Sequence, residues 1–216
     1  MKNLVIYGCG SVGRMIEQIV FDINQVASTW NVLGFIDDDQ NKIGSQVADL
    51  PVLGDLSAIP IDSDTFIAIG FSSPRQKKTA VEYIKSVGSF NLATLIHPRA
   101  WISRSVHIGE GAIIYPGVHI DVDVNIGCAV VLNKVCTVGH DTNIGDYSTA
   151  APGVNLGGNC QFDTGVEFGI NSATIQGIEI GAWSVIGGAA MVTKPIPPNS
   201  VAVGVPAKVI KQQIPN

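Results

Sequence analysis

The sequence lacks long hydrophobic runs, clusters of basic residues and closely paired cysteines. No run of the roughly eighteen apolar residues that a membrane span needs occurs among its 216 residues. The formal net charge is −5 without a basic stripe, which argues against nucleic acid and anionic membranes as partners. The first residues read as a strand and a turn without an apolar leader segment, so no secretory signal is expected. Together these absences favour a cytoplasmic protein.

The four cysteines do not show the spacing of a metal site. Cys9 belongs to a glycine-rich turn, and Cys128, Cys136 and Cys160 fall within the repeat described next. We therefore expect reduced thiols and no bound metal. Charged residues make up only 14% of the chain and hydrophobic residues 46%, which suits a stacked β core with little free surface.

An apolar residue recurs at every sixth position from Ile102 to Val192. The sixteen positions of this register are Ile102, Ile108, Ile114, Ile120, Ile126, Leu132, Val138, Ile144, Ala150, Leu156, Phe162, Phe168, Thr174, Ile180, Ile186 and Val192. Only Thr174 is plainly polar, and glycine often follows directly. A period of six fits neither an amphipathic helix nor a lone strand. It is typical of a hexapeptide β-helix, in which short strands joined by tight corners wind into a coil.

Three hexapeptides make one three-sided turn, so residues eighteen apart should stack at roughly the strand spacing of 4.8 Å. The Ile-Gly pairs that begin at Ile108, Ile126, Ile144 and Ile180 are separated by multiples of eighteen, as this arrangement requires. The alternative is a β-sandwich rich in glycine and valine, but it does not explain a register kept without an insertion.

Before the repeat, short apolar strands alternate with helices. Strands are expected at residues 3–7, 31–36, 52–53, 65–69 and 92–96, and helices at about 12–23 and 75–87. In the second helix, Val81, Ile84 and Val87 should face inward. This alternation predicts a small Rossmann-like parallel sheet. The expected domains are a nucleotide-sugar-binding domain (1–95), a β-helix (96–200) and a C-terminal tail (201–216).

Gly8, Gly10 and Gly13 satisfy the pattern G-x-G-x-x-G between a predicted strand and a predicted helix, and Asp37 follows the next strand. Such glycines let backbone N–H groups approach a phosphate, and an acidic side chain can bind a sugar hydroxyl or a base. A nicotinamide-dependent dehydrogenase is the direct interpretation. However, the α/β part ends near residue 95, about half of what a dinucleotide fold needs. We therefore predict a single nucleotide, such as a nucleotide-linked sugar; a tight turn without a ligand is the alternative.

One histidine has the setting of a catalytic base. His140 lies at or beside a corner of the coil, next to Asp141 and eighteen residues before Gly158. Imidazole titrates near neutrality and can take a proton from an attacking amine or hydroxyl, while the carboxylate would hold the ring. The missing side chain of Gly158 would leave a notch whose backbone N–H could face a carbonyl oxygen. The other histidines are expected to be surface residues (His107 and His119) or structural (His97).

Three segments carry a resemblance to a known family: LIHPRAWIS before the repeat, VGHDTNIGDYSTAAPGVNLGG within it and GVPAKVI near the end. They are similar to sugar acyltransferases that join a small nucleotide-binding domain to a left-handed β-helix. This family includes N-acetyltransferases of nucleotide-linked 4-amino-dideoxysugars used in bacterial surface glycans, and sialic acid O-acetyltransferases. The left-handed coil, acetyl-CoA as the acetyl donor and a homotrimer with active sites between neighbouring coils are implied by this resemblance.

The resemblance also implies roles for individual residues. Those matching the family's functional positions are His140 and Asp141 for catalysis; Gly10, Ser11, Asp37, Asp38 and Gly70 for the nucleotide sugar; and Thr149, Gly158, Ile170 and Gly188 for acetyl-CoA. Thr149 departs from the pattern, because close relatives can carry a second histidine there. The turn reads Gly10-Ser11-Val12, whereas relatives often have Gly-His.

The resulting prediction is N-acetylation of a nucleotide-linked 4-amino-4,6-dideoxysugar by direct attack on acetyl-CoA in a ternary complex. O-acetylation of a sugar such as sialic acid is the enzymatic alternative. A non-catalytic β-helix scaffold or nucleotide sensor is the alternative from another class, since fold alone does not determine function.

Overall fold

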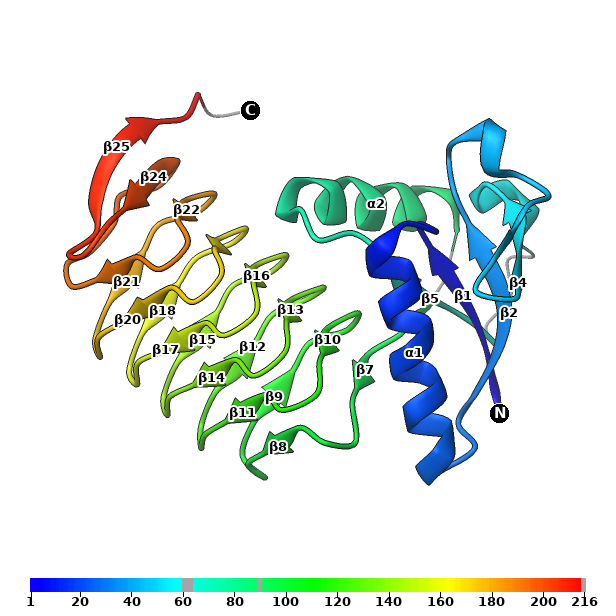
Figure 1. Ribbon diagram of the computed structural model, residues 1–216, viewed down its shortest axis with the longest axis horizontal. Helices are drawn as coiled ribbons and strands as arrows, with labels where there is room; N and C mark the ends of the chain where they lie inside the picture. Colours follow the sequence, from blue (N-terminus) through cyan, green and yellow to red (C-terminus); the bar gives the residue numbers. More distant parts are fainter. Residues whose placement is uncertain (60–63, 89–90, 215–216) are drawn as a thin grey trace. The chain divides into compact units, whose positions relative to one another are not determined.

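The computed structural model describes residues 1–59, 64–88 and 91–214. The chain divides into two compact units, one comprising Met1–Ser72 with Gln76–Pro98 and the other Ser73–Arg75 with Arg99–Asn216. Figure 1 shows a sheet with two helices in the first unit and a coil of short strands in the second. Among the described residues, no helix is both long and apolar enough to cross a membrane.

The first unit is built on a six-stranded sheet in the order β3-β4-β2-β1-β5-β6. Its strands are β1 (Lys2–Tyr7), β2 (Trp30–Ile36), β3 (Gln46–Val47), β4 (Leu50–Gly54), β5 (Thr65–Ile69) and β6 (Asn91–Leu92). All neighbours pair in parallel except β3 and β4, which form an antiparallel edge. The predicted parallel sheet is thus confirmed, and the short edge strand β3 was missed because two residues carry no periodic signal.

Two α-helices accompany this sheet, α1 (Ser11–Val26) and α2 (Pro74–Val87). The buried residues of α1 recur at helical spacing: Gly13, Ile16, Ile19 and Val20. In α2, Val81 and Ile84 are fully buried, but Val87 is 37% exposed at the helix end, so its predicted inward orientation was wrong. The 3₁₀ turns η1 (Gln40–Lys42) and η2 (Leu56–Ala58) begin after aspartates whose side chains accept backbone N–H groups.

The strand predicted at 92–96 was also wrong in its extent. The chain instead forms β6, leaves the ladder at Ala93 and Thr94, and resumes extended structure in β7 (Leu95–Ile96). His97 follows and is 5% exposed, with its Nε2 2.9 Å from Oδ2 of Asp22 on α1. This structural role agrees with the sequence prediction.

The second unit is a parallel β-helix whose strands form three faces (Figure 1). The first face contains β10 (Ile113–Ile114), β13 (Val131–Leu132), β16 (Thr149–Ala150), β19 (Glu167–Phe168), β22 (Val185–Ile186), β24 (Ser200–Val203) and β25 (Lys208–Gln212). The second contains β8 (Trp101–Ile102), β11 (His119–Ile120), β14 (Thr137–Val138), β17 (Asn155–Leu156), β20 (Ala173–Thr174) and β23 (Met191–Val192). The third contains β9 (His107–Ile108), β12 (Asn125–Ile126), β15 (Asn143–Ile144), β18 (Gln161–Phe162) and β21 (Glu179–Ile180).

The predicted register of eighteen is confirmed, since Ile108, Ile126 and Ile144 pair directly across neighbouring strands of the third face. Most residues of the six-residue register point into the coil and are buried, with Phe162 and Phe168 packed edge to face at 5.0 Å. Many corners contain a residue with positive φ, a conformation that glycine, Asn and Asp tolerate best. Gly, Asn or Asp occupies several of these positions, but Val135, Tyr147 and Trp183 also adopt positive φ there.

The segment expected as a tail after residue 200 contains regular structure. Strand β24 extends the first face in parallel with β22, and β25 returns antiparallel to β24. The hydroxyl of Ser200, which is fully buried, accepts a hydrogen bond from the Gln212 amide at 3.0 Å. These strands close the C-terminal end of the coil.

Candidate functional site

The glycine turn connects β1 to α1, and its glycines serve different purposes. Gly8 has φ +100°, which favours glycine. A Cβ on Gly13 would collide with the carbonyl oxygen of Gly8, so Gly13 permits close packing of the helix on the strand. A Cβ on Gly10 would meet no described atom within 4 Å. Since the fold itself does not require glycine at position 10, the open space there suits a ligand that approaches the uncapped N–H groups of α1.

Two further predicted residues lie around this turn. Ser11 is the first residue of α1 and is exposed. Gly70 follows β5 and donates its N–H to the carbonyl oxygen of Tyr7 at 2.7 Å. A Cβ on Gly70 would lie 2.6 Å from that oxygen and 2.8 Å from the Gly8 oxygen. Gly70 therefore has a packing reason to be glycine, in addition to the ligand role implied by the resemblance.

Asp37 is held by donors from three sides at the end of β2. Its carboxylate accepts the Cys9 N–H at 3.0 Å, the Cys9 thiol at 3.1 Å, the Asp39 N–H at 3.1 Å and the Lys42 ammonium at 3.1 Å. Burial alone would raise the pKa of Asp37, but these hydrogen bonds outweigh it and lower the pKa to about 2. Burial first, and then the hydrogen bond and charge of Asp37, raise the pKa of the Cys9 thiol, and the Lys42 charge offsets part of this rise.

Asp38 is exposed and has a different partner. Both of its oxygens lie near the hydroxyl of Tyr7, at 2.9 and 2.8 Å. Tyr7 is 3% exposed and packs edge-on against Phe71, with ring centroids 5.3 Å apart. Burial first, and then the hydrogen bond and charge of Asp38, raise the pKa of Tyr7. Sequence reasoning missed Tyr7 and Lys42, because no motif marks the residues that parallel strand ends bring together.

His140 and Asp141 form a corner of the coil after β14. Nδ1 of His140 lies 2.7 Å from Oδ2 of Asp141, and the two side chains are 60% and 57% exposed. An Nδ1–H that donates to the carboxylate leaves the lone pair on Nε2. The corner backbone is fixed on both sides, since Asp141 N–H donates to Val122 O and His140 O accepts from Asn159 N–H. Among the described residues, Nε2, the other ring nitrogen, has no hydrogen-bond partner, and the half-exposed ring faces solvent.

Gly158 lies directly against Nε2 of His140. A Cβ built on Gly158 would be 2.8 Å from Nε2 of His140 and about as close to its ring carbons, so only glycine leaves the imidazole in place. Its φ lies outside the left-handed region. In the described part of the chain, no acceptor is hydrogen-bonded to the Gly158 N–H. The notch expected from the sequence is therefore present, with an available N–H beside the His140 ring.

The remaining predicted acetyl-CoA residues are not brought together with His140 within one chain. Thr149 lies on the first face and is 7% exposed. Ile170, which is 58% exposed, and Gly188 stack at one corner, where a Cβ on Gly188 would lie 3.3 Å from Ile170 O. Gly158 belongs to a different corner. The face formed by β14, β17 and β20 separates the two.

The coil thiols are placed for packing. Cys136 is fully buried, and burial raises its pKa to about 11. Cys160 is 2% exposed, and its Sγ contacts the carbonyl oxygen of Gly158 at 3.5 Å from inside the coil. Neither thiol is accessible to an acyl donor at the His140 corner.

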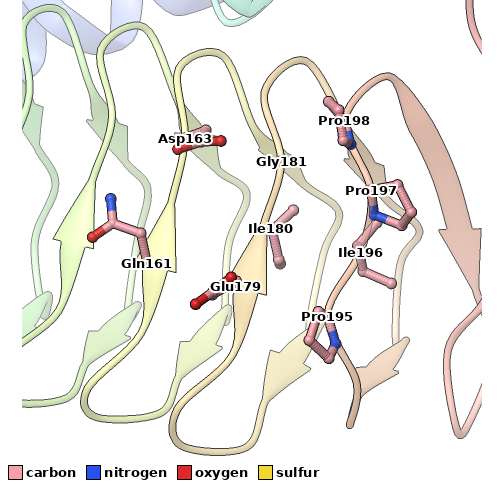
Figure 2. Close-up of a pocket in the computed structure, with 9 residues that line it drawn as sticks. All are labelled: Gln161, Asp163, Glu179, Ile180, Gly181, Pro195, Ile196, Pro197 and Pro198. Carbon is pink, nitrogen blue, oxygen red and sulfur yellow. The ribbon is translucent and has the colours of Figure 1, made fainter.

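A hollow of about 370 Å³ lies elsewhere on the coil, between the third face and the chain from Pro195 to Pro198. Figure 2 shows the residues that line it. Gln161 and Glu179 lie side by side on β18 and β21, with Asp163 nearby. Two carboxylates without a cationic residue in the lining suit neither the phosphates of a nucleotide nor those of a coenzyme. Among the described residues, no group of three or more metal-ligating side chains is present either. None of the predicted site residues lines this hollow.

Comparisons with known proteins identify the family of the chain. Residues 3–84 match the family described as the PglD N-terminal domain. The chain is 32% identical over 177 residues to a GDP-perosamine N-acetyltransferase of Escherichia coli O157:H7, covering 80% of this chain and 78% of that protein. PerB from Caulobacter crescentus, solved in complex with CoA and GDP-perosamine, superposes with a TM-score of 0.88 at 26% identity, covering 98% of each chain.

A second solved structure shares the fold. The acetyltransferase domain of PglB from Neisseria gonorrhoeae, solved with acetyl coenzyme A, superposes with a TM-score of 0.87 at 24% identity, covering 97% of this chain and 99% of that one. The coil is thus the left-handed β-helix of the hexapeptide-repeat acyltransferases. More particularly, the chain belongs to the family of nucleotide-linked amino-sugar N-acetyltransferases, and it is an enzyme that uses acetyl-CoA. The scaffold and sensor alternative is thereby set aside.

Proposed function

We propose that this enzyme acetylates the amino group of a GDP-linked 4-amino-4,6-dideoxysugar, with His140 as the general base. The observation that carries the proposal is the corner at which Asp141 holds Nδ1 and Gly158 leaves Nε2 accessible. The choice of GDP is supported by two relatives, named for or solved with GDP-perosamine. Such a product suits surface glycan synthesis, and we infer that the reaction takes place in the cytoplasm.

The chemistry requires only groups present at this corner. The sugar nitrogen attacks the thioester carbonyl carbon, so that a C–N bond forms and the C–S bond breaks. Nε2 of His140 accepts the proton that leaves the nitrogen and can return it to the departing sulfur. The Gly158 N–H would donate to the carbonyl oxygen as negative charge develops on it. Since Cys136 and Cys160 are buried, direct transfer in a ternary complex is favoured over an acyl-cysteine.

The first unit is proposed to bind the nucleotide. Open space at Gly10, the exposed Ser11 at the start of α1 and the exposed carboxylate of Asp38 support this role. Phosphates are stabilised at helix N-termini by unpaired N–H groups and the helix dipole. The coil is proposed to bind acetyl-CoA, so the two substrates would depend on different residues.

A homotrimer is proposed as the active form. The positions of Gly158 and of Ile170 with Gly188 at different corners support it, because a coenzyme touching both sets on one coil would have to cross a whole face. A cyclic arrangement of three copies can bring one corner beside the other corner of its neighbour. Size measurement by light scattering tests this: a monomer that is fully active would exclude it.

The proposed substrate is tested by thiol release from acetyl-CoA with a panel of GDP-, UDP- and dTDP-linked 4-amino sugars. We expect the highest kcat/KM with the GDP-linked sugar, and an N-acetylated product by mass spectrometry. Preference for a UDP- or dTDP-linked sugar would change the nucleotide assignment only. Acetylation of a hydroxyl instead of the amine would replace the proposal with the O-acetyltransferase alternative.

A further inference from the structure

The three consecutive carboxylates after β2 are not equivalent. A carboxylate offers roughly four lone-pair sites. Asp37 already receives the N–H and thiol of Cys9, the Asp39 N–H and the Lys42 ammonium, and its side chain is only 13% exposed. It has no acceptor capacity left for a ligand. Its contacts instead connect the glycine turn to the end of β2 and to η1.

Asp38 is in the opposite situation. Its one described donor is the Tyr7 hydroxyl, which lies between its two oxygens and leaves most of its lone pairs toward solvent. Tyr7 is itself immobilised, because it ends β1, is almost fully buried and packs edge-on against Phe71. An exposed carboxylate is thus held in one orientation by a rigid phenol.

We propose that Tyr7 and Asp37 are positioning residues for nucleotide binding, and that Asp38 alone of the two carboxylates contacts the ligand. Tyr7 orients the Asp38 carboxylate toward N–H or O–H donors of the nucleoside, while Asp37 fixes the glycine turn beside it. This inference rests on the proposed function of the first unit. It alters the role that the family resemblance gives Asp37, from a ligand contact to a support of the turn.

The experiment measures nucleotide binding directly, by calorimetry with GDP, UDP and dTDP on the full-length enzyme, alongside KM for both substrates. For Tyr7→Phe we expect about tenfold weaker nucleotide binding, because one charge-assisted hydrogen bond that orients Asp38 is lost. KM for acetyl-CoA and kcat at saturation should stay unchanged, and Tm should stay within about 2 °C of wild type. Tyr115→Phe is the matched control, since it makes the same change at another buried tyrosine, on the coil.

The two aspartates are separated by a second pair of variants. Asp38→Asn should weaken nucleotide binding with little change in Tm, whereas Asp37→Asn should lower Tm as well, since the turn loses its support. Unchanged nucleotide affinity in Tyr7→Phe would overturn the inference, as would lost affinity at an unchanged Tm in Asp37→Asn. Wild-type enzyme that binds none of the three nucleotides would overturn the proposed function together with it. Normal wild-type binding with an unaffected Tyr7→Phe overturns the inference alone.

Discussion

Gly158 shows how much of the proposed chemistry depends on one missing side chain. A single methyl group at this position would occupy the space of the imidazole, with its carbon 2.8 Å from Nε2. Because φ of Gly158 is not in the left-handed region, alanine would fit the backbone. The glycine is therefore required by the neighbouring ring rather than by the coil.

Gly158→Ala is accordingly predicted to lower acetyl transfer at least tenfold while Tm and assembly stay close to wild type. The cause would be a displaced His140 ring, so the effect should be strongly non-additive. In the His140→Ala background the same substitution should have little further effect. Steady-state kinetics of the two single variants and the double variant test this. Full additivity in this cycle would show that Gly158 acts independently of the ring.

Asp37 gives a prediction about pH. Its pKa in the folded protein is about 2, below the ordinary value of 3.8. The folded state therefore binds fewer protons, and this stabilisation is complete above about pH 4 and disappears as the pH falls toward 2. We expect Asp37→Asn to lower the free energy of unfolding by about 1–2 kcal/mol at pH 7 and by clearly less at pH 3. Urea unfolding at both pH values measures it.

The control for this measurement is Asp163→Asn on the coil. The Asp163 side chain makes no hydrogen bond within the described part of the chain, so its loss should change stability little at either pH. A pH-independent loss in Asp37→Asn would mean that the hydrogen bonds of Asp37 do not depend on its charge.

At the scale of elements, the turn between β1 and α1 contains two glycines with different roles. Gly13 is required by packing, whereas Gly10 is proposed to contact a ligand. Gly13→Ala would force its methyl group into the Gly8 carbonyl, so we expect a loss of several kcal/mol or failure to fold. Gly10→Ala meets no described atom and should leave Tm nearly unchanged. If a phosphate approaches this backbone, Gly10→Ala should nonetheless weaken GDP binding about tenfold. Tight GDP binding by this variant would show that the phosphates do not bind at the turn.

Inside the coil, the buried serine hydroxyls differ in their hydrogen bonding. The Ser148 hydroxyl accepts the Val166 N–H at 3.1 Å and donates to the main-chain carbonyl oxygen of Asp163 at 3.3 Å. Ser172 is fully buried and its oxygen has no partner among the described residues. Ala190 lies eighteen residues after Ser172, as Val166 does after Ser148. The N–H of Ala190 already donates to Gly187 O, so it does not reach the Ser172 hydroxyl.

Two serine variants should therefore shift stability in opposite directions. Ser172→Ala removes an unsatisfied buried hydroxyl and should raise the free energy of unfolding by about 1 kcal/mol. Ser148→Ala leaves a buried N–H unpaired and should lower it by about 1–3 kcal/mol. Thermal or urea unfolding compares them. Destabilisation of similar size in both would mean that Ser172 has a partner, such as an internal water.

These elements also show what the sequence could predict. The register of the coil was predictable, because each corner and each inward residue repeats the same physical requirement. The elements β3, η1 and β25 are short and have no periodic pattern of apolar residues. Their formation depends on tertiary contacts, so the sequence did not predict them. At the site, His140 and Gly158 could be related through the period of eighteen. Tyr7 and Asp38, thirty-one residues apart, are brought together only by parallel strand order.

At the scale of the whole molecule, the proposed function divides two substrates between two units. The glycine turn and Asp38 are proposed to bind the nucleotide. The corners of the coil are proposed to bind acetyl-CoA and to carry out the acetyl transfer. This division predicts that variants of the first unit change KM for the sugar nucleotide, and that Gly188→Val or Ile170→Ala changes KM for acetyl-CoA. Initial-rate measurements with each substrate varied in turn test it. Equal changes in both KM values for either set would contradict the division.

The central claim is that His140 is the base for acetyl transfer to an amine. Its most direct test is the turnover of His140→Ala with acetyl-CoA and GDP-perosamine, followed by thiol release and by detection of the N-acetylated sugar. We predict that kcat falls by on the order of 10²–10⁴, with Tm and nucleotide binding unchanged. Turnover close to wild type at neutral pH, with the same N-acetylated product, would contradict the claim.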